Sequence, residues 1–175
     1  MLRVAPRCRG RRGRGLLGFA AHEVRACGVG AEHVDAAFEV YYAARNVVEC
    51  YPDALPALSA LAARFPLVSI SNGNADLARI GLHHHFRATV TAREVGFAKP
   101  DKRIFDAACT RLGIAAEHVL HVGDDAALDV VGARGAGLRT AWLNRGGATW
   151  SHGPAPDLTI DTLDTLADWI LARAA

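Results

Sequence analysis

Lysine is scarce in this sequence of 175 residues, because only two of its twenty basic residues are lysines, Lys99 and Lys102. The arginines are unevenly distributed along the chain. Six of them lie within the first fourteen positions, and no acidic residue precedes Glu23. No aromatic residues are interleaved with these arginines. Such a segment predicts at most weak, salt-sensitive contact with polyanions, so we expect no specific nucleic-acid partner.

Cysteine pairs and long apolar runs are also missing. The four cysteines are widely spaced and form no Cys-x-x-Cys pair, which excludes a dense disulfide framework and favours reduced thiols in a cytoplasmic protein. No window approaches the roughly 18 apolar residues needed to cross a bilayer. The Arg-rich start lacks the apolar core of a secretory signal, so we expect no membrane partner.

The length and the 51% hydrophobic content predict one ordinary domain that buries about 70% of its unfolded surface. Residues 1–15 are rich in glycine and arginine without a hydrophobic period, and we expect them to be disordered. Apolar residues recur at helical spacing over 16–27 and over 32–50. They predict two amphipathic helices separated by a glycine-containing break at 28–30.

From position 51 onward the pattern changes to alternating helices and strands. A helix that starts at Pro52-Asp53 leads to Phe65-Pro66. We then expect strands over 67–71, 88–91, 119–122 and 139–143, an edge strand over 158–160, and helices over 75–81, 101–112, 126–136 and 163–172. Short apolar strands joined by helices predict an α/β fold, with a parallel sheet covered by helices on both faces. In such sheets, ligands bind beyond the carboxyl ends of the strands.

Three carboxylates, those of Asp124, Asp125 and Asp129, follow the strand that ends at Val122. The helix dipole favours one acidic residue at a helix start, but three within six residues repel one another unless a cation is present. Mg²⁺ prefers oxygen ligands and keeps several waters, so one or two carboxylates and a substrate phosphate suffice. We predict Asp124 as the direct ligand, Asp129 as the holder of a metal-bound water, and Asp125 as either ligand or helix cap.

Two further segments follow strands and could bind an anion. The turn Ser71-Asn72-Gly73 offers a hydroxyl, an amide and backbone N–H groups, although the same residues also make an ordinary turn before a helix. Lys99, in the loop before Pro100, can neutralise a phosphate as a compact charge, or it can be an ordinary solvated lysine.

The histidines are expected to have structural roles. Consecutive side chains point in different directions, so the run His83-His84-His85 is unsuited to one metal ion. His121 lies on the strand before Gly123, and we expect it to be buried and hydrogen-bonded.

Taken together, Ser71, Lys99 and the run Gly123-Asp-Asp-x-x-x-Asp129 resemble motifs two, three and four of the haloacid dehalogenase-like hydrolases. From about Tyr51 to the C-terminus, the chain is most similar to the branch of flavin mononucleotide phosphatases and related small-phosphoester phosphatases. The resemblance implies a Rossmann-like core over 51–175 and a partial helical cap over 16–50. It also implies Mg²⁺ as the cofactor and a small phosphorylated substrate, with phosphate-binding residues at Ser71, Asn72, Gly73 and Lys99.

The family nucleophile is the first aspartate of an Asp-x-Asp pair at the end of the first strand, and the second aspartate is the general acid and base. This chain has no such pair, and the single aspartate within residues 1–50 is Asp35. In the family topology the missing strand is central, between the strands that end at Ser71 and Asp124. Its absence would leave two edges unpaired, at about 1–3 kcal/mol for each unsatisfied group against a total stability of about 5–15 kcal/mol.

Two functional hypotheses follow from the resemblance. The first is a magnesium-dependent phosphatase of small phosphoesters that forms an aspartyl-phosphate, here N-terminally truncated and inactive alone. The second is a catalytically dead module that still binds phosphate and metal. Dehalogenases of the family share a Ser-Asn-Gly turn but lack the metal-binding acids, so Asp124 and Asp129 favour a phosphatase. The sequence does not indicate the oligomeric state.

Overall fold

The computed structural model describes residues 2–3, 30 and 33–173, so the predicted helix over 16–27 lies outside the described residues. Most of the 1–15 segment lies outside them too. Its residues Leu2–Arg3, expected to be without structure, form strand β1, which pairs antiparallel with β2 (Glu49–Cys50). Backbone pairing between two extended segments needs no hydrophobic period, so the composition of 1–15 did not reveal it.

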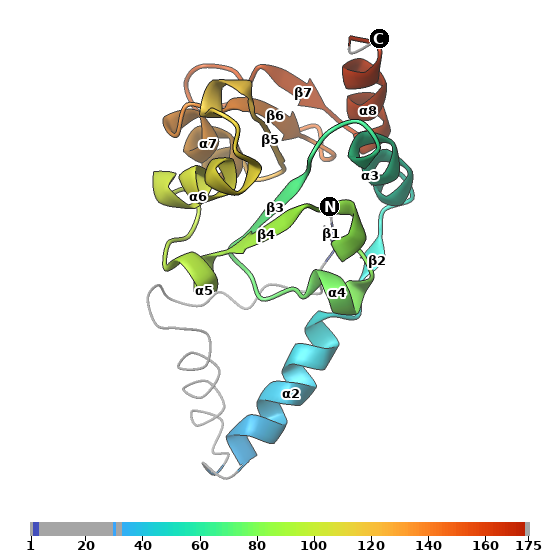
Figure 1. The fold of residues 1–175 in the computed structure, drawn as a ribbon, viewed down its shortest axis with the longest axis vertical. Helices are drawn as coiled ribbons and strands as arrows, with labels where there is room; N and C mark the ends of the chain where they lie inside the picture. Colours follow the sequence, from blue (N-terminus) through green and yellow to red (C-terminus); the bar gives the residue numbers. More distant parts are fainter. Residues whose placement is uncertain (1, 4–29, 31–32, 174–175) are drawn as a thin grey trace.

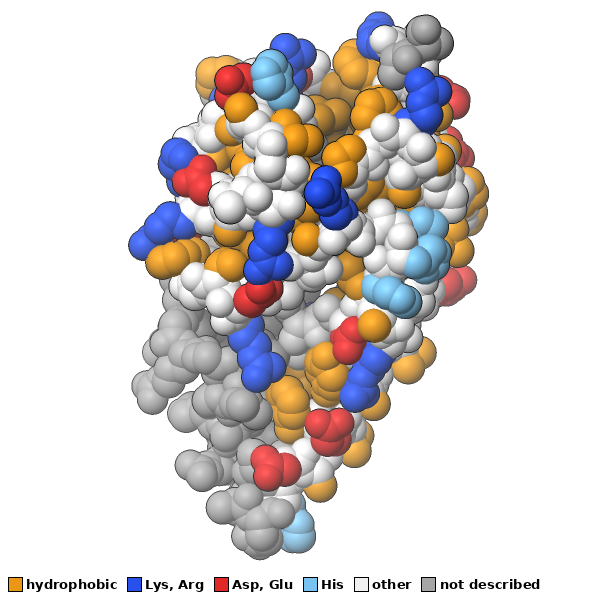
Figure 2. Space-filling model, viewed as in Figure 1, with side chains coloured by type: hydrophobic (Ala, Val, Ile, Leu, Met, Phe, Trp, Pro, Cys, Tyr) orange, Lys and Arg blue, Asp and Glu red, His pale blue; other side chains and the backbone are white. Residues whose placement is uncertain are grey.

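Helix α2 (Val34–Arg45) is shorter than the helix expected over 32–50. It ends at Arg45, and after Asn46 the β-branched residues Val47 and Val48 lead into β2. Branching at Cβ restricts the side chain in a helix and favours extended backbone, which accounts for the early end. Tyr41 and Val47 are 47% and 84% exposed, and hydrophobic side chains are visible over α2 in the lower part of Figure 2.

Helices α3 (Ala54–Ala62) and α8 (Leu163–Leu171) lie side by side at one end of the molecule (Figure 1). The Asp53 carboxylate joins them, because it accepts hydrogen bonds from the Leu163 backbone N–H and from Arg145, both at 2.6 Å. Burial alone would raise the pKa of Asp53, but these hydrogen bonds lower it below its ordinary value. Asp53 therefore holds the C-terminal helix onto the start of α3.

The fold is α/β with parallel strands and helices on both faces, as expected. Strand β3 (Val68–Ser71) pairs with β4 (Ala88–Thr91), while β5 (Leu120–Gly123), β6 (Arg139–Leu143) and β7 (Leu158–Ile160) form a second parallel group. The connecting helices are α4 (Leu77–Ile80), α5 (Ala92–Val95), α6 (Lys102–Leu112), a π-helical segment (Ala126–Val131) and α7 (Gly132–Gly135). All five strands expected between 67 and 160 are confirmed, and each boundary lies within one residue of its predicted position.

Two hydrophobic clusters form the core. One lies under α3 and α8 and includes Leu143, Ile160 and Leu166. The other lies under α6 and includes Val90, Ile104 and Phe105. Among the described residues, no helix combines the length and apolar character that a membrane crossing requires.

The sheet is interrupted between β3 and β5. Strand β3 pairs only with β4, and β5 pairs only with β6, so no described strand lies between them. Every residue of β3 and β5 is partly exposed, whereas Thr140 and Ala141 of β6 are completely buried. The resemblance described above predicts a central strand at this place.

Candidate active site

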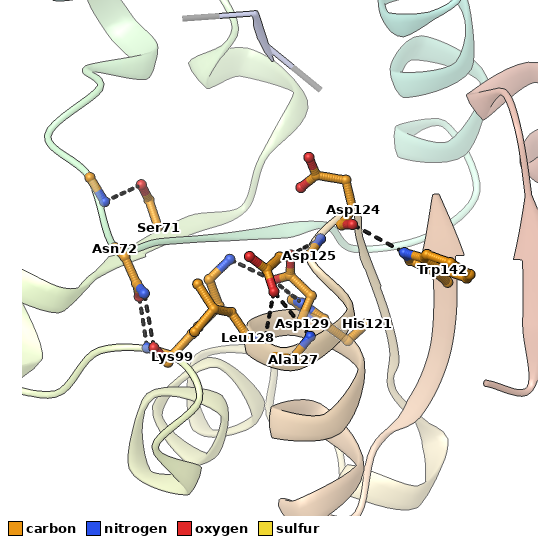
Figure 3. Close-up of polar contacts among 11 residues, drawn as sticks. Ser71, Asn72, Lys99, His121, Asp124, Asp125, Ala127, Leu128, Asp129 and Trp142 are labelled. Atoms are coloured by element: carbon orange, nitrogen blue, oxygen red, sulfur yellow. Dashed lines mark hydrogen bonds and ion pairs between the residues drawn. The ribbon is translucent and has the colours of Figure 1, made fainter. Parts of the chain in front are cut away.

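Three segments meet at the carboxyl ends of β3 and β5: the turn 71–73, the loop of Lys99 and the run 123–129 (Figure 3). Asn72 joins the first two, because its side chain donates to the Lys99 carbonyl at 3.0 Å and accepts from the Lys99 N–H at 2.7 Å. The Asn72 amide thus anchors the lysine loop. The two residues are 27 positions apart and share no recognisable sequence pattern, so the sequence does not reveal this link.

Ser71 closes the turn through its side chain. Its Oγ accepts a hydrogen bond of 3.0 Å from the Gly73 N–H. The hydroxyl hydrogen remains able to donate, since a serine hydroxyl both donates and accepts. Ser71 can therefore offer a donor to an oxyanion in front of the turn.

Lys99 is held against Asp129 by an ion pair of 2.6 Å, and both side chains are largely buried, at 14% and 5% exposure. The same carboxylate lies 3.0 Å from His121 Nε2 and accepts from the Asp125 N–H at 3.1 Å. Burial would raise the pKa of Asp129, but the His121 hydrogen bond and the charge of Lys99 lower it to about 2. Asp129 is therefore a carboxylate that fixes the direction of Lys99.

Gly123, at the end of β5, is required by this arrangement. A Cβ added there would overlap the Asp129 carboxyl group, which its three hydrogen-bond partners hold in place. The absence of a side chain lets the buried aspartate approach the strand. The predicted hydrogen bond of His121 is confirmed by its contact with Asp129, and the His121 side chain keeps 10% of its surface exposed.

Asp124 has the opposite environment to Asp129. Its carboxylate is exposed and accepts no hydrogen bond from side chains of the described residues, while its backbone carbonyl accepts from Trp142 Nε1 at 3.0 Å (Figure 3). Partial loss of solvent and the nearby charge of Asp129 raise the pKa of Asp124 above its ordinary value. This group would gain from a cation.

Asp125 caps the helical segment that follows. Its side chain accepts hydrogen bonds from the Ala127 and Leu128 N–H groups, at 3.0 and 2.9 Å. Of the two roles that the sequence left open for Asp125, the structure thus shows the contacts of a helix cap.

The metal prediction can be tested against these contacts. The described residues contain no group of three or more His, Cys, Asp or Glu side chains arranged to hold a metal. One free carboxylate, that of Asp124, remains after Asp129 has been bound by Lys99 and Asp125 by the helix. The site fits Mg²⁺ all the same, because this ion uses one or two carboxylates together with water and substrate oxygens.

Helix α2, which belongs to the predicted partial cap, is fixed to the chain just beyond the Ser71 turn. Tyr42 OH donates to Asp76 at 3.3 Å, and the Asn46 side-chain oxygen accepts from the Asp76 N–H at 2.7 Å. These contacts place the C-terminal end of α2 beside the candidate site.

Comparisons with known proteins identify sequences and folds to which this chain is similar. The family model of haloacid dehalogenase-like hydrolases matches residues 6–137. A phosphoserine phosphatase from Thermus thermophilus is 37% identical over 71% of this chain and 53% of its own length. A pyrimidine 5'-nucleotidase from Escherichia coli is 38% identical over 66% of this chain and 54% of its own length.

Among solved structures, a 2-haloacid dehalogenase from Pseudomonas syringae pv. Tomato is 35% identical, with a TM-score of 0.82. The match covers 91% of this chain and 70% of that protein. The chain spans about half the length of the curated relatives it matches.

Proposed function

Because the chain belongs to the haloacid dehalogenase-like hydrolases, we propose that its site binds a small phosphoester together with Mg²⁺ and is that of a cytoplasmic phosphatase. Its relatives include phosphatases of phosphoserine and of glyceraldehyde 3-phosphate, and both names describe small phosphorylated compounds. The widely spaced cysteines agree with a reducing compartment.

The observation that carries this proposal is the buried ion pair between Lys99 and Asp129, at 2.6 Å. In the proposed site, Lys99 neutralises the phosphoryl charge, while the Ser71 hydroxyl and the backbone of the turn donate to its oxygens. Asp124 would hold Mg²⁺, and Asp129, which positions Lys99, would also hold a water bound to that ion. When bound, Mg²⁺ supplies charge neutralisation for the phosphate.

Turnover needs a nucleophile, and this sequence contains no Asp-x-Asp pair. In the part of the chain that the structure describes, no strand lies between β3 and β5 to bring a carboxylate to the site. We therefore expect the chain alone to bind the phosphoester without hydrolysing it. A catalytically dead binding module is the alternative reading of the same contacts.

A haloacid substrate is the second candidate, favoured by the 35% identity to a 2-haloacid dehalogenase. The exposed Asp124 is evidence against this candidate, because a carboxylate without a side-chain partner among the described residues is suited to a cation that dehalogenation does not require. Binding of a 2-haloacid without Mg²⁺, combined with no binding of phosphate, would favour this candidate.

The test is calorimetric titration of the chain with inorganic phosphate in the presence of Mg²⁺. Replacing Lys99 by methionine should weaken binding by about tenfold to a hundredfold, because it removes a charge-assisted contact of about 1.5–3 kcal/mol. Lys102→Met is the matched control, since Lys102 is exposed and, among the described residues, pairs with Asp106 alone. Equal affinity of wild type and Lys99→Met for phosphate would show that Lys99 does not bind the phosphate.

Activity is measured in parallel as Mg²⁺-dependent phosphate release from an aryl phosphate, with Asp124→Asn as reference. We expect no rate above that of the variant. Hydrolysis that Asp124→Asn abolishes would show that a nucleophile exists in the chain after all.

A further inference from the structure

The peptide group between Asp124 and Asp125 is held from both sides (Figure 3). Its carbonyl oxygen accepts a hydrogen bond from Trp142 Nε1 at 3.0 Å, and its N–H donates to Asp129 Oδ2 at 3.1 Å. This peptide lies just beyond Gly123, where the pairing of β5 with β6 ends. Two side chains therefore fix the orientation of a peptide group that the strand pairing no longer holds.

Trp142 reaches the Asp124 carbonyl because of its place in β6. In the strand register it lies opposite Gly123, the residue before Asp124. Trp142 is buried, and its ring meets that of Trp150 edge to face, with the centroids 5.3 Å apart. Trp150 is itself held, because its Nε1 donates to the Gly153 carbonyl at 2.8 Å. The indole of Trp142 is thus fixed by its surroundings before any ligand binds.

The orientation of this peptide group affects where the Asp124 carboxylate points. That carboxylate accepts no hydrogen bond from side chains of the described residues, so its direction depends on the main chain and on two side-chain torsions. A ligand group that is already close to its bound position loses less conformational freedom when an ion binds. A hydrogen bond to the Asp124 main chain can therefore strengthen ion binding without touching the carboxylate.

We infer that Trp142 is a positioning residue for Asp124, whose carboxylate it holds in the direction that binds Mg²⁺. This inference rests on the proposed function, which assigns the ion to Asp124. The same hydrogen bond also acts on Asp129, because the carbonyl and the N–H of one peptide group polarise each other. Asp129 in turn orients Lys99. Trp142 thus links the metal-binding side of the proposed site to its phosphate-binding side.

Trp142→Phe tests the hydrogen bond, because phenylalanine keeps an aromatic ring and lacks the donor. The dissociation constant for Mg²⁺ is measured from the rise in unfolding temperature over a series of MgCl₂ concentrations at constant ionic strength, with inorganic phosphate present. This constant should increase about threefold to tenfold in the variant, the range expected for the loss of one hydrogen bond.

Trp150→Phe is the matched control. It also removes an indole N–H that donates to a backbone carbonyl, and its ring contacts Trp142, but its acceptor is Gly153. The dissociation constant for Mg²⁺ should stay within about twofold of wild type. If Trp142→Phe does not fold, Trp142 is replaced by 3-benzothienylalanine, which has the shape of tryptophan without the N–H, and the same loss of affinity is expected.

The indole N–H resonances in NMR spectra give a second readout, which a purely structural role would not change. The chain has three tryptophans, Trp142, Trp150 and Trp169, and their variants assign the three resonances. Mg²⁺ should shift the Trp142 resonance with the dissociation constant found from unfolding, while that of Trp169, on α8, should not move. In Asp124→Asn the shift of the Trp142 resonance should disappear.

Equal Mg²⁺ affinity of wild type and Trp142→Phe, or an equal loss in Trp142→Phe and Trp150→Phe, would overturn this inference while the Mg²⁺ site stands. A Trp142 resonance that does not respond to the ion would overturn it as well. Failure of wild type to respond to Mg²⁺ in either measurement would instead overturn the proposed metal site, and the inference with it.

Discussion

Asp124 and Asp129 are five positions apart, and the fold gives their carboxylates opposite electrostatic environments. Asp129 is buried against Lys99 and His121, and its pKa falls to about 2. Asp124 is exposed, with a pKa raised by partial desolvation and by the charge of Asp129. The Asp129 carboxylate has its hydrogen-bond and charge partners within the protein, whereas the Asp124 carboxylate is available to a cation.

We expect Asp124→Asn to stabilise the metal-free chain at neutral pH. A carboxyl whose pKa is raised by folding destabilises the native state when ionised, and this cost disappears below its unfolded pKa near 4. Because Asp124 is exposed, the gain should be at most about 0.5 kcal/mol. Chemical unfolding at pH 7 and at pH 3.5 measures it, and a gain that persists at pH 3.5 would contradict this cause.

Asp124→Asn also tests which of the neighbouring aspartates binds Mg²⁺ directly. Wild type should gain about 1.4 kcal/mol when Mg²⁺ reaches ten times its dissociation constant, and Asp124→Asn should gain nothing. Asp125→Asn is the matched control, because asparagine loses the same charge and still caps the helix. If only Asp125→Asn lost the Mg²⁺ response, the direct ligand would be Asp125.

At the scale of elements, strands β5 and β6 are neighbours with different surroundings. Strand β6 pairs with β5 on one side and β7 on the other, whereas β5 pairs on one side only among the strands that the structure describes. In a parallel strand, alternate amides face opposite neighbours, so half of the β5 amides face the interrupted side of the sheet.

Hydrogen exchange should therefore alternate along β5 and be uniformly slow along β6, where Thr140, Ala141, Trp142 and Leu143 are buried. Residue-resolved exchange by NMR measures this. Protection of β3 should alternate as well, because β4 is its one partner among the described strands. Uniform protection throughout β5 would mean that its second edge is paired in solution.

Sequence patterns predicted these elements well where the signals, the spacing of apolar residues and the helix-capping residues, come from residues close together in the sequence. Helix α6 was predicted over 101–112 and begins after Asp101, whose side chain accepts from the Arg103 N–H. The end of the predicted helix over 32–50 was wrong, because its last residues form β2 by pairing with β1, a contact distant in the sequence. The division into cap and core stays a prediction.

At the scale of the whole molecule, the interrupted sheet predicts that an added strand both stabilises the fold and completes the site. We expect a chain extended before Met1 by an apolar strand ending in Asp-x-Asp to unfold at a higher temperature. It should also release phosphate from an aryl phosphate with Mg²⁺, at least about a hundredfold faster than an extension ending in Asn-x-Asn.

The Asn-x-Asn extension is the structural control, since it should stabilise the fold equally without supplying a nucleophile. If neither extension raises the unfolding temperature, the place between β3 and β5 does not accept a strand. If both release phosphate equally, the activity does not come from the added carboxylates.

The sequence by itself determined the parallel α/β fold, the order of its strands and the residues Ser71, Lys99, Asp124 and Asp129 as site candidates. These predictions need one sequence only, because the spacing of apolar residues and the polar residues that follow the predicted strands can both be recognised in it. It also determined the lack of an Asp-x-Asp pair.

The role of each candidate residue depends on contacts that form in the folded protein. Only the tertiary structure paired Asp129 with Lys99, made Asp125 a cap, left Asp124 free and brought Trp142 to the Asp124 carbonyl. These outcomes depend on distances between residues far apart in the chain, and on burial, which decides whether a charge is paired inside the protein or left for a ligand.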